Sequence, residues 1–235
     1  MIFSTIRYRQ IYRIVNDLYI NLFLCSFPID IINIINLFEN IKILSYSQFM
    51  KRYKHSYAET LEILNSKEGC AYYDPIKDNY IIFYNDLDVT LSERIYWTIA
   101  HEFGHIMCGH HIEDTSIKNH SLSDEKYRIV ECEANYFASI FLAHPAVLSK
   151  LNIHNSYEIE VFCNLSSQAA RYRYKNFLNW TSYDFMTSSD RRITRNFKEY
   201  IDSKNQDYIE HMQFIQAFYR SVSYTHLRAH ETRSN

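Results

Sequence analysis

The sequence predicts a mostly helical α+β fold, with a small antiparallel β-sheet before a central helix and a helical region after it. Apolar residues recur at helical spacing along most of the chain, and strand-like runs are confined to residues 41–44 and 69–84. At 235 residues, with 47% hydrophobic and 22% charged residues, the chain has the length and composition of a globular protein with one sizeable domain.

The chain opens with two predicted helices. Residues 4–26 have the pattern of an amphipathic helix. Pro28 suits the first turn of a second helix that continues to about Glu39. The inward faces of these two helices are expected to be Ile11, Val15, Leu18, Leu22, Ile31, Ile34, Ile35 and Phe38.

A hairpin follows. Residues 41–44 predict a short strand, and residues 47–65 a less regular helical region. Two β-rich runs, Gly69–Tyr73 and Tyr80–Tyr84, flank a turn-rich loop and predict an antiparallel pair of strands.

The second half of the chain is helical. A helix is expected from about Leu91 to Gly109, then a polar loop to Leu122, then a helix from Asp124 to Ala143 that Pro145 ends or redirects. Several short helices are expected over residues 146–220.

We expect four segments along the chain: an N-terminal helix, a main domain, a C-terminal helical region and a tail. The tail resembles a translated transposase adapter from sequencing-library preparation, so we set it apart from the fold. The segments span residues 1–26, 27–145, 146–221 and 222–235.

Composition and charge argue against several classes of partner. The net charge is −2 and no long basic run occurs, so we expect no direct contact with nucleic acid. Pro28 and polar residues interrupt the apolar stretch from Leu18 to Phe38, so we expect no membrane span, and we expect no signal peptide. The five cysteines are scattered and odd in number, which favours a reducing, cytoplasmic compartment.

The central helix carries a His-Glu-x-x-His motif at His101, Glu102 and His105. Residues four apart lie on one helical face, so both imidazoles can bind one zinc ion. Glu102 flanks that point and can act as general base on a zinc-bound water. The alternative is two ordinary histidines, because the chain has 11 histidines and the motif can arise by chance.

Local context favours a helix around the motif. Thr90 and Glu93 have the spacing of a capping box, and an apolar stripe recurs from Ile95 to Ile106. Gly104 costs up to about 1 kcal/mol relative to alanine inside a helix, so its presence suggests that another element packs closely there.

A third ligand is expected, because catalytic zinc usually has three protein ligands. Glu133 shares an apolar stripe of the following helix, and an inward carboxylate is costly unless it is paired or bound to metal. We therefore predict Glu133. Glu131, on a more polar arc, and His111, at the last position of a metzincin-like spacing, remain alternatives, and Cys108 is disfavoured by crowding.

These motifs resemble the ImmA/IrrE family of metallo-endopeptidases. The resemblance lies in Trp97–Ile106, in the run from Glu131 to Ala138, in Leu142–Pro145, and more weakly in Phe27–Asp30, Tyr84–Asn85 and Leu165–Arg173. Together it covers roughly residues 27–178. His144 departs from the apolar residue more usual before Pro145 in the family.

The resemblance implies a gluzincin-like zinc peptidase with His101, His105 and Glu133 as ligands and Glu102 as base. It further implies a cytoplasmic protease that cuts a helix-turn-helix repressor. The candidate donors of a hydrogen bond to the oxyanion are His110, His111, His120 and Tyr136.

Two other functions are possible. One is a zinc-stabilised module that sequesters a regulatory partner without cleaving it, which an intact Glu102 disfavours. The other is a secreted metzincin-like protease, which Cys108 disfavours because the metzincin pattern has glycine there.

Overall fold

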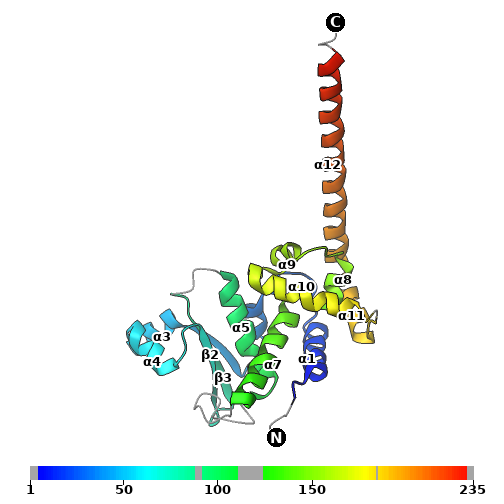
Figure 1. The fold of residues 1–235 in the computed structure, drawn as a ribbon. Helices are drawn as coiled ribbons and strands as arrows, with labels where there is room; N and C mark the ends of the chain where they lie inside the picture. The colour runs from blue at the N-terminus through cyan, green and yellow to red at the C-terminus, as the bar shows by residue number, and fades with distance from the viewer. Residues whose placement is uncertain (1–4, 88–91, 111–123, 184, 232–235) are drawn as a thin grey trace.

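The fold is organised around two helices, α5 (Ser92–Met107) and α7 (Asp124–Leu142), which lie side by side in the computed structural model (Figure 1). The structure describes residues 5–87, 92–110, 124–183 and 185–231, with side chains as far as residue 218 except at 217. The predicted capping box at Thr90 and the polar loop before Leu122 therefore lie outside the described residues.

A three-stranded sheet packs against α5. The predicted hairpin is confirmed: β2 (Gly69–Asp74) pairs antiparallel with β3 (Asn79–Tyr84). The strand β1 (Ile41–Ser45), however, pairs parallel with β3, so the sheet is mixed rather than wholly antiparallel, in the order β1-β3-β2. The connection from β1 to β3 is long enough to return the chain in the same direction.

That connection begins with two short helices, α3 (Tyr46–Tyr53) and α4 (Tyr57–Leu64). Ser45 and Ser56 cap their N-termini with capping boxes, and each helix ends at a left-handed residue, Lys54 or Asn65. These local stop signals explain why residues 47–65 have the pattern of an irregular helical region.

The first two helices are shorter than expected. Helix α1 spans Tyr8–Asn21, and α2 spans only Ile31–Ile35. Pro28 does not begin α2: it follows a cis peptide bond, and Asp30 caps the helix instead. Most of the predicted inward side chains are nevertheless buried; Leu22 and Phe38 are partly buried.

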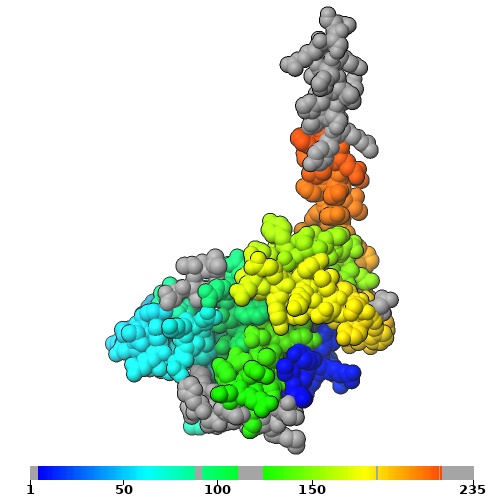
Figure 2. Space-filling model, viewed as in Figure 1, coloured from blue at the N-terminus to red at the C-terminus, as the bar shows by residue number. Residues whose placement is uncertain are grey.

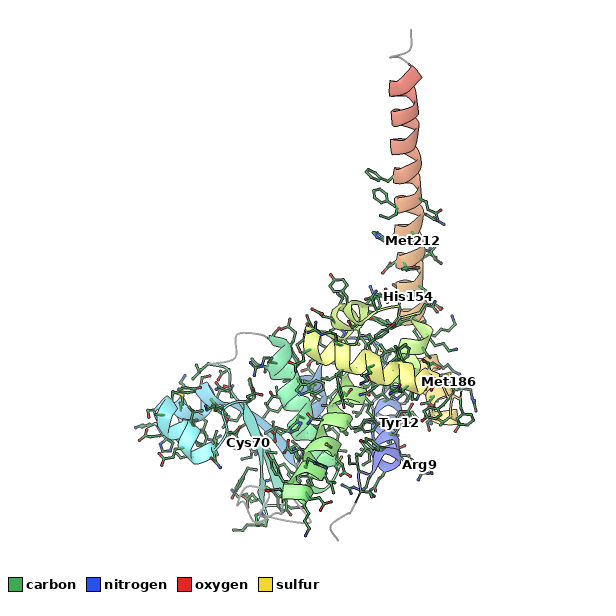
Figure 3. All side chains as sticks on the ribbon, in the orientation of Figure 1. Arg9, Tyr12, Cys70, His154, Met186 and Met212 are labelled. Atoms are coloured by element: carbon green, nitrogen blue, oxygen red, sulfur yellow. The ribbon has the colours of Figure 1, made fainter. Side chains whose placement is uncertain are left out.

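Four short helices follow α7 as predicted: α8 (Pro145–Lys150), α9 (Ser156–Cys163), α10 (Ser167–Thr181) and α11 (Ser188–Asn196). The last segment differs, because residues 198–231 form one long helix, α12 (Lys198–Glu231). It projects from the body as a single rod, with Met212 well outside the remaining helices (Figures 1, 2 and 3). No described helix has the length and apolarity to cross a membrane.

The main core lies between α1, α5, α7 and the C-terminal helices. Phe103 of α5 packs edge-on against Phe137 and Phe141 of α7, and all three side chains are fully buried. The phenol of Tyr12 on α1, labelled in Figure 3, donates to Asp190 of α11 at 2.8 Å and so joins α1 to α11. The predicted mostly helical α+β class is confirmed, whereas the four-segment division stays a prediction.

Candidate metal centre

The two motif histidines converge as their spacing predicts. His101 and His105 lie one turn apart on α5, and their Nε2 atoms are 3.0 Å apart. His105 is buried, whereas His101 is partly accessible. Their Nε2 atoms therefore face one common point.

Glu131 of α7 completes a triangle with them. Its carboxylate oxygens lie 3.3 Å from Nε2 of His101 and 3.5 Å from Nε2 of His105. Among the described residues, these three form the group of potential metal ligands, with donor atoms within 4.8 Å of one another. Ligands of a tetrahedral zinc lie about 3.3–3.5 Å apart, so the donor set and its spacing fit that metal.

Glu133 is not at this point, contrary to the sequence prediction. Its side chain is only 1% exposed, so the inference that it faces the interior is correct. Its charge is instead balanced by Arg7, which precedes α1 and whose Nη2 lies 2.5 Å from Oε2. Nε2 of His110 lies 2.9 Å from the same oxygen. The structure thus brings Glu131, the alternative considered from sequence, to the histidines.

Helical geometry separates the two glutamates. Residues two apart are rotated by roughly 200° around a helix, so Glu131 and Glu133 face nearly opposite directions. Asn135, one turn beyond Glu131, also faces α5, and its Oδ1 lies 3.1 Å from Nδ1 of His101. The i, i+4 spacing of Glu131 and Asn135 is a signal in the sequence that could have indicated Glu131 as the ligand.

Hydrogen bonds at Nδ1 orient both imidazoles. His101 donates through Nδ1 to Oδ1 of Asn135, which leaves Nε2 as the nitrogen that faces the common point. The Nδ1 atom of His105 lies 2.8 Å from Nδ1 of His110, just beyond the end of α5. Such partners on the nitrogen opposite the metal are typical of metal-binding histidines.

Glu102 lies between α5 and the edge of the sheet. The backbone N–H of Ala71 on the edge strand β2 donates to its Oε2 at 2.7 Å. The carboxylate is thus anchored beside the histidines without belonging to the three-residue cluster. This is the placement expected of a group that acts on a water molecule rather than on the metal.

Burial and charge shape the titration of the cluster. Burial lowers the pKa of His105 to about 4, only partly opposed by Glu131. Burial would also lower the pKa of His101, but hydrogen bonding to Glu131 and the charge of Glu102 raise it. Burial would raise the pKa of Glu131, yet its bonds to both histidines lower it below the usual range. The cluster therefore favours an ionised carboxylate beside at least one neutral imidazole.

The other candidate groups have different surroundings. Cys108 is buried, and burial raises the pKa of its thiol to about 12, which does not favour a thiolate ligand. Among the proposed oxyanion donors, His110 is buried against His105, and Tyr136 packs edge-on against Tyr8. His111, the alternative third ligand, and His120 lie outside the described residues.

A comparison with protein-family models agrees with this geometry. The model of the IrrE N-terminal-like domain of the M78 peptidases matches residues 44–175, more than half of the chain. The chain belongs to the M78 peptidase family. The match contains both α5 and the Glu131–Ala138 signature of α7, on which the sequence resemblance to ImmA/IrrE proteins depends.

M78 membership establishes a peptidase-type protein and leaves its substrate open. The match does not include Arg7 or the helices α1, α11 and α12. A comparison with curated proteins finds no match.

Proposed function

We propose that this M78 protein is a zinc metallo-endopeptidase. The observation that supports it best is the convergence of His101, His105 and Glu131, beside the anchored carboxylate of Glu102. Zinc, when bound, would supply a Lewis acid that polarises the scissile carbonyl and activates water.

Each residue then has a separate role. His101, His105 and Glu131 hold the ion, with Glu131 in place of Glu133. Glu102 takes a proton from the attacking water as the water oxygen bonds to the carbonyl carbon. Glu102 later gives that proton to the amine nitrogen as the C–N bond breaks. The N–H of Ala71 fixes the direction of one Glu102 oxygen during both transfers.

The substrate class comes from the family resemblance. We propose a protein substrate, in particular a helix-turn-helix repressor whose cleavage relieves repression. A cytoplasmic location suits this role, and the five cysteines, all free thiols, are consistent with a reducing compartment.

The test combines metal content with cleavage. Wild-type protein should contain about one zinc per chain and cut a helix-turn-helix repressor from a co-expressed panel. Glu102→Gln should retain zinc and lose at least about 10²-fold in cleavage rate, because no base remains to accept the proton. Glu131→Gln should lose both zinc and cleavage.

An exposed glutamate on the same helix provides the control. Glu125→Gln should behave as wild type, since its side chain faces solvent. Full cleavage by Glu102→Gln, or full zinc content in Glu131→Gln, would contradict the assigned roles. A repressor that co-purifies uncut with wild type would favour the alternative of a zinc-stabilised sequestering module.

A further inference from the structure

A buried chain of polar groups runs from the N-terminal segment to the candidate metal centre. It begins at Arg7, whose backbone N–H lies 2.7 Å from Oε1 of Glu133 and whose Nη2 lies 2.5 Å from Oε2. The same Nη2 donates to the carbonyl of Cys108 at 3.0 Å. One arginine therefore holds both Glu133 and the C-terminal turn of α5.

The second link joins Glu133 to His110. Oε2 of Glu133 lies 2.9 Å from Nε2 of His110, and both side chains are buried. Arg7 donates to both carboxylate oxygens of Glu133 through Nε and Nη2. A carboxylate paired with arginine in this way accepts hydrogen bonds, so Nε2 of His110 is the donor to Oε2.

The third link joins His110 to His105. Their Nδ1 atoms lie 2.8 Å apart, which requires one proton between them. With a metal ion on Nε2, the His105 ring would carry its proton on Nδ1 and would donate it to Nδ1 of His110. His110 would in turn donate from Nε2 to Glu133.

A turn at Gly109 makes this contact possible. Gly109 has φ = +75°, the left-handed conformation that commonly ends helices, and it directs His110 back toward His105. A metzincin-like spacing would bring a third metal ligand through such a turn. In this chain, the turn brings a hydrogen-bond partner for an existing candidate ligand.

We propose that Arg7, Glu133 and His110 are positioning residues that hold the His105 ring in the Nδ1-protonated tautomer and so raise the affinity of the centre for zinc. The inference rests on the proposed function for its metal and assigns a role to Glu133 other than ligation. It also gives the segment before α1, which lies outside the M78 match, a part in the centre.

The first experiment reads the tautomer directly. Long-range ¹H–¹⁵N NMR of the zinc-loaded, histidine-labelled protein should show His110 protonated at Nε2 and unprotonated at Nδ1. A proton on Nδ1 of His110 would overturn the proposal, because His110 could then not accept from His105. Protein that takes up no zinc would instead contradict the proposed function, so the two failures are distinguishable.

The second experiment measures zinc affinity by chelator competition. His110→Leu removes the acceptor for His105 and should weaken zinc binding by about 10–100-fold. His110→Asn offers an amide oxygen near the former Nδ1 position and should recover most of that affinity. The exposed His154→Leu is the matched control and should bind zinc as wild type does.

The pattern of affinities decides the outcome. A structural role alone would not distinguish His110→Asn from His110→Leu once both are shown to be folded by circular dichroism. Equal affinity of His110→Leu and wild type, within about twofold, would overturn the proposal.

Discussion

At the scale of single residues, the site depends on which way each buried polar group faces. Glu131 and Glu133 are only two residues apart, yet one faces the α5 histidines and the other faces Arg7. The sequence identifies His101, Glu102 and His105, because a motif within one helix contains its own geometry. It does not identify the partner of Glu133, because Arg7 lies 126 residues away in the chain.

His144 is a buried histidine outside the metal centre. Its Nε2 lies 2.8 Å from Oδ1 of Asn16, and its Nδ1 accepts from the N–H of Ala146 at the start of α8. Burial, together with the charge of Arg173, lowers its pKa from 6.5 to about 3. The neutral ring thus satisfies both neighbours, and a proton on Nδ1 would break the helix cap.

This depressed pKa predicts a pH-dependent stability. The unfolded chain takes up a proton on His144 below about pH 6.5, and the native state does not. The contribution of His144 to the unfolding free energy is therefore complete above that pH and is lost as the pH falls toward 3. Between pH 7 and 5.5, the unfolding free energy of wild type should fall by about 1 kcal/mol more than that of His144→Gln. Urea unfolding in the presence of a chelator measures the unfolding free energy of both proteins, and the chelator prevents metal release from contributing to it.

A second buried position separates this effect from a general loss of packing. Tyr19→Phe removes the 2.7 Å hydrogen bond to the carbonyl of Phe141 and should cost about 1 kcal/mol at either pH. Its pH slope should match wild type. The same slope in His144→Gln and wild type would count against the buried neutral imidazole.

At the scale of elements, the packing of α7 against α5 determines how close Glu131 lies to the two histidines. A Cβ atom at Gly104 would lie 3.0 Å from Cδ1 of Phe137 and 3.2 Å from the carbonyl oxygen of Ala134. The sequence predicts a close neighbour at Gly104, and the structure identifies that neighbour as α7.

Gly104→Ala should therefore destabilise the protein. The extra methyl would favour the helix by about 1 kcal/mol, but the backbone of Ala134 and the buried ring of Phe137 have little room to move. We expect a net loss of about 1–3 kcal/mol in unfolding free energy, measured by denaturant titration.

A double-mutant cycle tests the cause. Phe137→Leu shortens the opposing side chain, so its effect combined with Gly104→Ala should be smaller than the sum of the two single effects. Strict additivity, or a more stable Gly104→Ala protein, would show that the helices do not restrict each other at this position.

At the scale of the whole molecule, α12 differs from every other helix. Its first turns contact the body through buried Ile201 and through Asn205, which donates to the carbonyl of Lys150 at 3.1 Å. The rings of Tyr208 and His154 stack with their centroids 5.9 Å apart. Most described side chains beyond Tyr208 are exposed. The outer part of α12 therefore adds little packing to the core.

Deletion of residues 211–235 should change the melting temperature by less than about 2 °C, since few contacts with the body are lost. Thermal unfolding followed by circular dichroism measures the change. Deletion from Lys198 onward is the control, because it also removes Tyr200 and Ile201 and should lower the melting temperature. A fall above about 5 °C in the shorter deletion would mean that the outer helix supports the fold, contrary to the prediction that residues 222–235 lie apart from it.

The sequence by itself determined the helical α+β class, the hairpin, the motif helix and the ImmA/IrrE resemblance, because each depends on residues close together in the chain. Only the tertiary structure decided that Glu131 rather than Glu133 meets the histidines, that β1 runs parallel to β3, and that Arg7 reaches Glu133. The physical reason is that a buried carboxylate must be neutralised, and several distant groups can do so. Which group does so depends on how the helices pack.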